Sequence, residues 1–186
     1  MSASDVNVWG AMTDLQHDLL FGLFLTPDAG QPEQILELAR LADTAGLDLL
    51  GVQDHPYQPR FLDMWTLLSV VASQTRRIRL FPDVVNLPFR PPAVLARAAA
   101  SLDILSGGRI ELGLGSGAFP DAASSMDAPR RDPKEAIDAL TEAIAVLRAL
   151  WTPGPPVAPR RRALFVARSA TRTDSAAPYQ CLAGRL

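Results

Sequence analysis

Short apolar runs and amphipathic helical stretches alternate along this chain from residue 21 to residue 151. Four runs predict strands because they are brief, rich in Leu, Ile, Val or Phe, and followed by turn residues. These predicted strands are residues 21–25, 49–52, 78–81 and 110–114. The first is expected to be buried on both faces, as strands of a parallel sheet are.

A helix with one apolar face is predicted after each strand. The first begins at Pro32 and ends at Gly46, Asp63 caps the second, Gly107 and Gly108 end the third, and Asp132-Pro133-Lys134-Glu135 starts the fourth with a capping box. The positions expected to face the core are Ile35, Leu38, Ala39, Ala42 and Ala45; Trp65, Leu68, Val71 and Ala72; Val94, Leu95, Ala98, Leu102 and Leu105; and Ile137, Leu140, Ile144, Leu147 and Trp151.

Four such β-α units in succession predict an α/β fold with a parallel sheet and right-handed crossovers. A closed (β/α)8 barrel needs about 250 residues, so the chain is expected to form an incomplete TIM-type barrel, with about the first four of eight units. A doubly wound open sheet is the alternative, and it predicts a glycine fingerprint that opens a helix after the first strand. Residues 26–30 lack that fingerprint, which favours the barrel.

Charge and composition divide the chain into a leader at residues 1–17, a half-barrel domain at 18–154 and a tail at 155–186. The leader is polar and aperiodic, and we expect it to be flexible. The tail holds six Arg and one Asp, whereas residues 1–154 hold 12 basic and 19 acidic side chains. We expect the tail to be disordered, in the manner of a truncated or frame-shifted end of a longer gene. Anion binding by Arg160–Arg162 is the alternative for this segment.

The whole chain has 186 residues, of which 48% are hydrophobic, and a formal charge of -2. This charge predicts no bulk attraction to nucleic acid or to an acidic membrane surface. The single cysteine, the lack of a signal peptide and the lack of an apolar run of about 20 residues predict a cytoplasmic protein without a membrane span.

Candidate chemistry lies where the predicted strands end, since active sites of parallel barrels lie at that edge. His55 follows the second strand and could move a proton near neutral pH or bond to a ligand oxygen, with Asp54 as an orienting or structural neighbour. A surface histidine held by Pro56 is the simpler interpretation. After the third strand, a bulge could turn Asn86 toward a ligand, although this segment could equally be an ordinary strand end.

Gly113, Gly115 and Gly117 recur at every second position of the fourth strand, so one face of this strand has no side chains. A planar ring could lie against that face, or the glycines could serve tight packing inside the barrel. We predict no metal site.

Three segments carry a resemblance to a known family: residues 45–55 (AGLDLLGVQDH), 75–80 (TRRIRL) and 102–117 (LDILSGGRIELGLGSG). With them, residues 20–152 resemble the N-terminal half of the luciferase-like flavin monooxygenases, which include bacterial luciferases, alkanesulfonate monooxygenases and F420-dependent reductases. The third segment is the most specific, because its helix end, Gly-Gly turn and glycine-rich strand follow in the family's order.

The resemblance implies a barrel that binds reduced FMN, or alternatively the deazaflavin F420, at the strand ends. It places His55 near the reactive edge of the ring as proton donor, base or positioning group. It also implies a bulge at Asp83 and Val84, often joined by a non-proline cis peptide in the family. Asn86 and the region of Gly115, Ser116 and Gly117 would contact the ring.

The implied reaction is either oxygenation of a small organic substrate by reduced FMN and molecular oxygen or hydride transfer with F420. The FMN reaction could involve a flavin reductase as partner. A Glu acid that some F420-dependent sugar-phosphate dehydrogenases carry after the glycines is replaced here by Ala118. A non-catalytic half-barrel or assembly partner is the third hypothesis. An open half-barrel exposes strand edges and an apolar inner wall, which predicts self-association.

Overall fold

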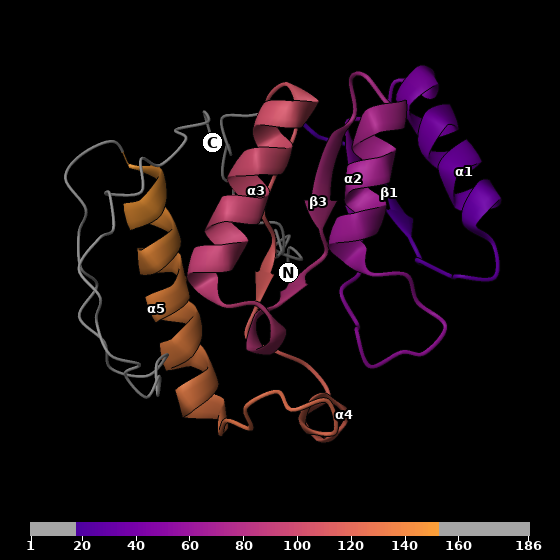
Figure 1. Cartoon of the computed structure of the whole chain (residues 1–186). Helices are drawn as coiled ribbons and strands as arrows, with labels where there is room; N and C mark the ends of the chain where they lie inside the picture. Colours follow the sequence, from indigo (N-terminus) through magenta and orange to yellow (C-terminus); the bar gives the residue numbers. More distant parts are fainter. Residues whose placement is uncertain (1–17, 153–186) are drawn as a thin grey trace, which may run out of the picture.

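The computed structural model describes residues 18–152. The predicted flexible leader at residues 1–17 and the predicted disordered tail at 155–186 lie outside the described residues. Strands and helices alternate through the described part, and Figure 1 shows helices α1, α2 and α3 in one layer in front of the strands. The elements are β1 (Gly22–Leu25), α1 (Pro32–Ala45), β2 (Leu49–Val52), α2 (Met64–Gln74), β3 (Arg79–Pro82), β4 (Val85–Asn86), the 3-10 helix η1 (Leu87–Phe89), α3 (Pro92–Ser106), β5 (Leu114–Gly115), α4 (Pro120–Ser124) and α5 (Pro133–Trp151).

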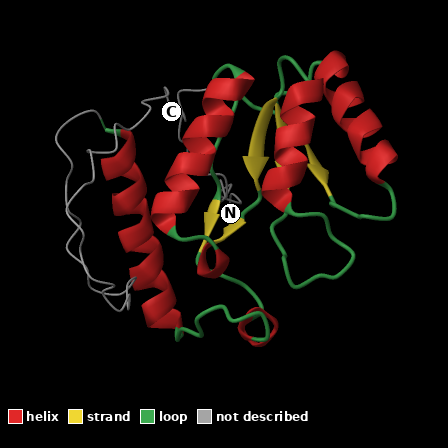
Figure 2. Cartoon of the chain, viewed as in Figure 1, coloured by secondary structure: helices red, strands yellow, loops and turns green. Residues whose placement is uncertain are grey.

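All paired strands are parallel, which confirms the predicted α/β fold. Strands β1, β2 and β3 form one sheet in the order β1-β2-β3, and β4 pairs with β5 in a second short ladder. A single parallel bridge between Leu80 and Ile110 joins the two ladders. Figure 2 shows how short these strands are beside the helices.

The helix ends follow the sequence signals. Gly46 and Gly107 are the C-cap residues of α1 and α3 and have left-handed backbone conformations. A residue with a Cβ adopts this conformation only with steric strain. The Asp63 side chain accepts a hydrogen bond from the Thr66 N–H at the start of α2. At the start of α5, Asp132 and Glu135 form the predicted capping box.

Three details of the chain between residues 82 and 125 differ from prediction. The fourth strand was expected at residues 110–114, but only Leu114–Gly115 forms a ladder and Ile110 makes an isolated bridge. The segment expected to be irregular after β3 contains β4 and η1. The short helix α4 lies in a segment expected to be a loop.

The core lies between the sheet and the helices, and its outline corrects several predictions. The buried side chains that fill it include Leu50, Val52, Leu68, Val71, Leu80, Leu95 and Leu147. Among residues 18–152, helices cover only one face of the sheet, so β1 is not buried on both faces and Phe24 is 53% exposed. The sequence pattern also placed Leu38, Ala45, Val94, Leu105 and Ile137 in the core, whereas all five are exposed.

Alanines form much of the buried surface of α3 and α5, and this explains why Val94, Leu105 and Ile137 were wrongly placed in the core. Ala96, Ala99 and Ala100 of α3, with Ala139 and Ala143 of α5, are buried, and these two helices pack against each other. Small side chains let helices approach closely, so the larger apolar residues on either side of these alanines remain outside the contact.

Arg109 is a structural clamp in the segment with the most specific resemblance. Its guanidinium is buried and donates hydrogen bonds to the Ala72, Thr75 and Ile78 carbonyls, the Thr75 hydroxyl and the Ser106 carbonyl. Asp43 acts in a similar way, because its carboxylate accepts the backbone N–H groups of Arg76, Arg77 and Ile78. These two side chains therefore attach α1, α2 and α3 to the start of β3.

No helix within residues 18–152 combines the length and the apolar character that crossing a bilayer requires.

Candidate functional site

The ends of β2, β4 and β5 lie at one edge of the sheet, because these strands run parallel. Asn86 at the end of β4 pairs in register with Gly115 of β5. The Asp83 N–H donates to the Val52 carbonyl at 2.7 Å, which attaches the end of β2 to the segment before β4. The structure therefore brings together the ends of the three strands on which the predicted site residues lie.

His55 lies at this edge in a half-buried position among aromatic rings. Its Nδ1 atom is 2.7 Å from the Tyr57 hydroxyl, which also lies 3.5 Å from the Ala118 carbonyl oxygen. The ring centroids of Tyr57 and Phe119 lie 5.5 and 5.8 Å from that of His55. Tyr57 thus links the imidazole after β2 to the loop after β5.

Neither Tyr57 nor Phe119 was predicted as a site residue from the sequence. A tyrosine two residues after a histidine at a predicted strand end was a usable signal, but nothing local indicated that the side chains would meet. Phe119 lies 64 positions beyond His55, so only the tertiary fold reveals that contact.

Asp54 is a structural neighbour of His55. Its buried carboxylate accepts the Asn86 N–H at 3.0 Å and pairs with Arg90, whose Nη2 atom lies 2.9 Å from Oδ1. Arg90 also pairs with Asp63 at 2.8 Å. Burial alone would lower the pKa of Arg90, but the hydrogen bonds and charges of Asp54 and Asp63 outweigh it and raise the pKa above its ordinary value.

The Asn86 side chain is buried between Tyr57 and the β5 loop. Its Oδ1 atom is buried without a hydrogen-bond partner, and it would lie 3.6 Å from a Cβ placed on Gly117. Burial is the main cause of a raised pKa for Tyr57, and the negative charge of Asp54 adds to it. A hydrogen bond with the Asn86 side chain acts in the opposite direction, and the net effect keeps the phenol protonated over a wide pH range.

The side-chain-free face of the glycine strand is not open. A Cβ on Gly113 would lie 2.5 Å from the Pro82 carbonyl oxygen, one on Gly115 would lie 2.6 Å from Val84 Cγ2, and one on Gly117 would lie 2.7 Å from Pro88 Cγ. The segment from Pro82 to Pro88 already occupies the space beside these glycines, so the geometry favours tight packing, the alternative interpretation, over a ring that lies directly on this face.

Val84 is the exposed apolar side chain beside the glycine strand. The peptide bond between Asp83 and Val84 is cis, as the resemblance implied, and both side chains are exposed. Val84 packs over Gly113 and Gly115 and remains 41% exposed. It lies on the face of the sheet that no described helix covers.

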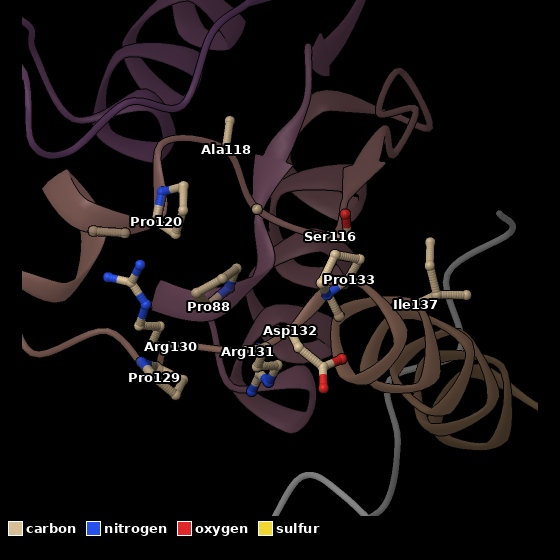
Figure 3. Close-up of a pocket in the computed structure, with 13 residues that line it drawn as sticks. Pro88, Ser116, Ala118, Pro120, Pro129, Arg130, Arg131, Asp132, Pro133 and Ile137 are labelled. Carbon is tan, nitrogen blue, oxygen red and sulfur yellow. The ribbon is translucent and has the colours of Figure 1, made fainter.

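Two cavities border this edge of the sheet. The smaller, about 150 Å³, lies beside His55 and includes Asp54 and Asp63 in its lining. The larger, about 740 Å³, contains Ser116 and Gly117 in its wall. Figure 3 shows Arg130 beside Pro120 in this wall, with Pro133 and Ile137 at the opposite end.

The charged side chains that line the larger cavity are Arg130, Arg131 and Asp132. Arg130 pairs with Asp121, and both side chains are largely exposed. Arg131 also lines the cavity, and its Nη1 atom is buried without a partner. In the part of the chain from residue 18 to residue 152, no group of three or more His, Cys, Asp or Glu side chains is arranged to hold a metal ion.

Comparison with known proteins shows a specific similarity. The family model for luciferase-like monooxygenases matches residues 17–178. An F420-dependent glucose-6-phosphate dehydrogenase of Nocardia farcinica is 34% identical over 145 residues, which are 73% of this chain and 42% of the relative. The chain thus spans about two-fifths of the length of this curated relative.

Solved structures are similar over the same region. Monooxygenase RslO1 from Streptomyces bottropensis is 31% identical with a TM-score of 0.63, over 72% of this chain and 43% of that one. The oxygenating constituent of 3,6-diketocamphane monooxygenase from Pseudomonas putida, solved in complex with FMN, is 28% identical with a TM-score of 0.63, over 73% and 40% of the two chains.

Proposed function

This chain belongs to the luciferase-like monooxygenase family, and from that premise we propose that it supplies the His55 side of a flavin-type redox site. We propose reduced FMN as the cofactor, with molecular oxygen and a small organic substrate as reactants. F420 with hydride transfer is the second candidate, because F420-dependent and FMN-containing proteins are both among the relatives. The observation that carries the proposal is the meeting of His55, Asn86 and the Gly115–Ala118 segment at one strand edge.

The residues at this edge fit a flat, largely apolar ring with polar atoms on its rim. Val84 offers an exposed apolar contact, and Phe24 on the same uncovered side of the sheet is also exposed. The ring would lie on Val84 rather than on Gly115, with Asp83 beside it. Ser116 and Gly117 in the larger cavity, together with Arg130 and Arg131, would hold the anionic tail that FMN and F420 both carry.

Bound reduced FMN would supply the electrons that activate oxygen, and bound F420 would supply or accept a hydride. The chain's own residues would provide binding, proton transfer and exclusion of water. His55 would hold or move a proton at Nε2, since Nδ1 is engaged by Tyr57. Asp54 would act indirectly, because it anchors Asn86 through the backbone N–H.

We further propose that residues 18–152 correspond to the first four β-α units of a parallel barrel and that a complete site needs further units. Phe24 and Val84 leave an apolar surface on the uncovered face of the sheet, and the β1 edge is unpaired in the described residues. A second copy of the chain, with four β-α units of its own, could complete the eight units of a barrel. Without such closure, the chain would be a non-catalytic half-barrel. A flavin reductase would be the partner only if FMN is the cofactor.

Size-exclusion chromatography with light scattering tests the association. We expect a dimer at micromolar concentration, and a stable monomer without aggregation would contradict it.

Binding of the ring is tested by calorimetric titration of the full chain with reduced FMN and with F420 under anaerobic conditions. Val84→Thr keeps the shape of the side chain but places a hydroxyl under the ring, which should weaken binding about tenfold, or about 1.4 kcal/mol. Val94→Thr is the matched control, since Val94 is 65% exposed on α3 and lines neither of the two cavities. Equal affinities for the two variants, or no saturable binding of either cofactor, would refute the proposal.

A further inference from the structure

Three aromatic rings lie close to the Tyr57 side chain. Its ring centroid lies 5.5 Å from that of His55, 5.8 Å from that of Phe119 and 6.2 Å from that of Phe89. All three contacts are tilted or edge-on, the arrangement that aromatic pairs prefer. These ring contacts restrict the orientation of the Tyr57 side chain, so its hydroxyl stays close to His55.

The hydroxyl has one hydrogen atom and two possible acceptors. His55 Nδ1 at 2.7 Å lies at the ideal distance for an O–H donor, whereas the Ala118 carbonyl oxygen at 3.5 Å lies at the limit of a hydrogen bond. A phenol that donates to Nδ1 makes the shorter of its two possible hydrogen bonds, whereas an Nδ1–H group that donates to the phenol would leave the hydroxyl only the 3.5 Å contact with Ala118, so the geometry favours Nδ1 as the acceptor. The phenol oxygen can still accept a hydrogen bond from the Asn86 side-chain amide, whose contact with Tyr57 also affects the Tyr57 pKa.

A nitrogen that accepts a hydrogen bond carries no proton of its own. Neutral imidazole has one N–H, so acceptance at Nδ1 places the proton on Nε2. Within residues 18–152, Nε2 has no hydrogen-bond partner, so it is the ring nitrogen available to a ligand.

We propose that Tyr57 is a positioning residue that holds neutral His55 in the Nε2–H form, so that His55 meets its ligand as a hydrogen-bond donor. The ligand atom opposite His55 must then be an acceptor, such as a carbonyl or an alkoxide oxygen. A ligand that offers only a donor at this point would be rejected, because two N–H or O–H groups would face each other. The identity of the ligand rests on the proposed function, whereas the form of the imidazole does not.

Nitrogen-15 NMR of the full chain, labelled at histidine and recorded above the titration range of imidazole, tests the proposal directly. The chain has only two histidines, so His17→Gln assigns the spectrum. We expect the His55 signals of a single Nε2–H form with a hydrogen-bonded Nδ1. In Tyr57→Phe, the Nδ1 signal should move to that of a nitrogen without a hydrogen bond, and a share of the Nδ1–H form should appear.

Phe119→Leu separates the hydroxyl from the packing, because it removes a ring contact and keeps the hydrogen bond. Its spectrum should match that of the parent chain. An Nδ1–H form in the parent chain, or the same spectrum in Tyr57→Phe as in the parent, would overturn the proposal. A chain that binds neither FMN nor F420 but shows this histidine spectrum would refute the proposed function alone.

Discussion

Replacement of Gly113 by Ala tests whether the glycine strand serves packing or ligand access. The added Cβ would lie 2.5 Å from the Pro82 carbonyl oxygen and 3.1 Å from Val84 Cγ1. Real Cβ atoms essentially never approach other atoms closer than 3.0 Å, so one of the two strands must shift. Pro82 cannot yield easily, because it is paired with Val52, and the Gly113 carbonyl accepts the Val85 N–H at 2.9 Å.

Overpacking of this kind costs about 1–3 kcal/mol, and loss of the Val85 hydrogen bond would add about 1 kcal/mol. We therefore expect Gly113→Ala to lower the free energy of unfolding by about 3 kcal/mol. With a urea dependence of about 2 kcal/mol per molar, the unfolding midpoint falls by about 1.5 M. The assay is urea unfolding of the full chain followed by far-UV circular dichroism and tryptophan fluorescence.

Gly107→Ala is the matched control. A Cβ at Gly107 meets nothing within 4 Å, so the change is penalised only by the left-handed backbone conformation, at about 1 kcal/mol. A stability of Gly113→Ala within about 0.5 kcal/mol of the parent chain would refute the packing explanation. If Gly113→Ala kept its stability but bound FMN or F420 more weakly, the glycine face would instead be reserved for the ligand.

Three further changes probe the connections around the site, each by the same unfolding assay. Asp54→Asn should lower the free energy of unfolding by about 3 kcal/mol, because it breaks a buried ion pair, although Arg90 keeps its pairing with Asp63. An unchanged unfolding midpoint would contradict the anchoring role of Asp54. Arg109→Gln should lower the free energy of unfolding by about 3 kcal/mol, because the guanidinium donates five hydrogen bonds. A smaller loss of stability than for the same substitution at an exposed arginine would contradict the structural role of Arg109. Burial would raise the pKa of Asp43, but its three backbone donors and Arg109 hold it below the ordinary value of 3.8. Stability from Asp43 should thus be complete above about pH 4 and fall as the pH drops through the folded-state pKa, and Asp43→Asn should show a weaker dependence between pH 2 and 5.

Much of the fold was predictable because its signals are local. Helix starts at Asp63 and Asp132 and helix ends at Gly46 and Gly107 depend on backbone groups within a few residues. The order of strands and helices follows from short apolar runs and helical spacing, and this order favours a parallel sheet. Parallel strands end on the same side of a sheet, so the common location of His55 and Asn86 at one strand edge was also predictable.

Burial of individual helix positions was less predictable. The spacing of large apolar residues pointed to Val94, Leu105 and Ile137, but the contact between α3 and α5 uses alanines. Which face of a helix is buried depends on the neighbouring helix, and the neighbour is not encoded near the residue itself.

By itself, the sequence determined the sites of the caps, the alternation of strands and helices, and the placement of a histidine at a strand end. Tertiary structure alone decided that Tyr57 meets His55, that Asp54 connects to Arg90 across 36 positions, and that Val84 covers the glycines. The physical reason is the range of the interactions involved. Caps and periodicity depend on neighbours along the chain, whereas the chemistry of this site depends on contacts between residues that only folding brings together.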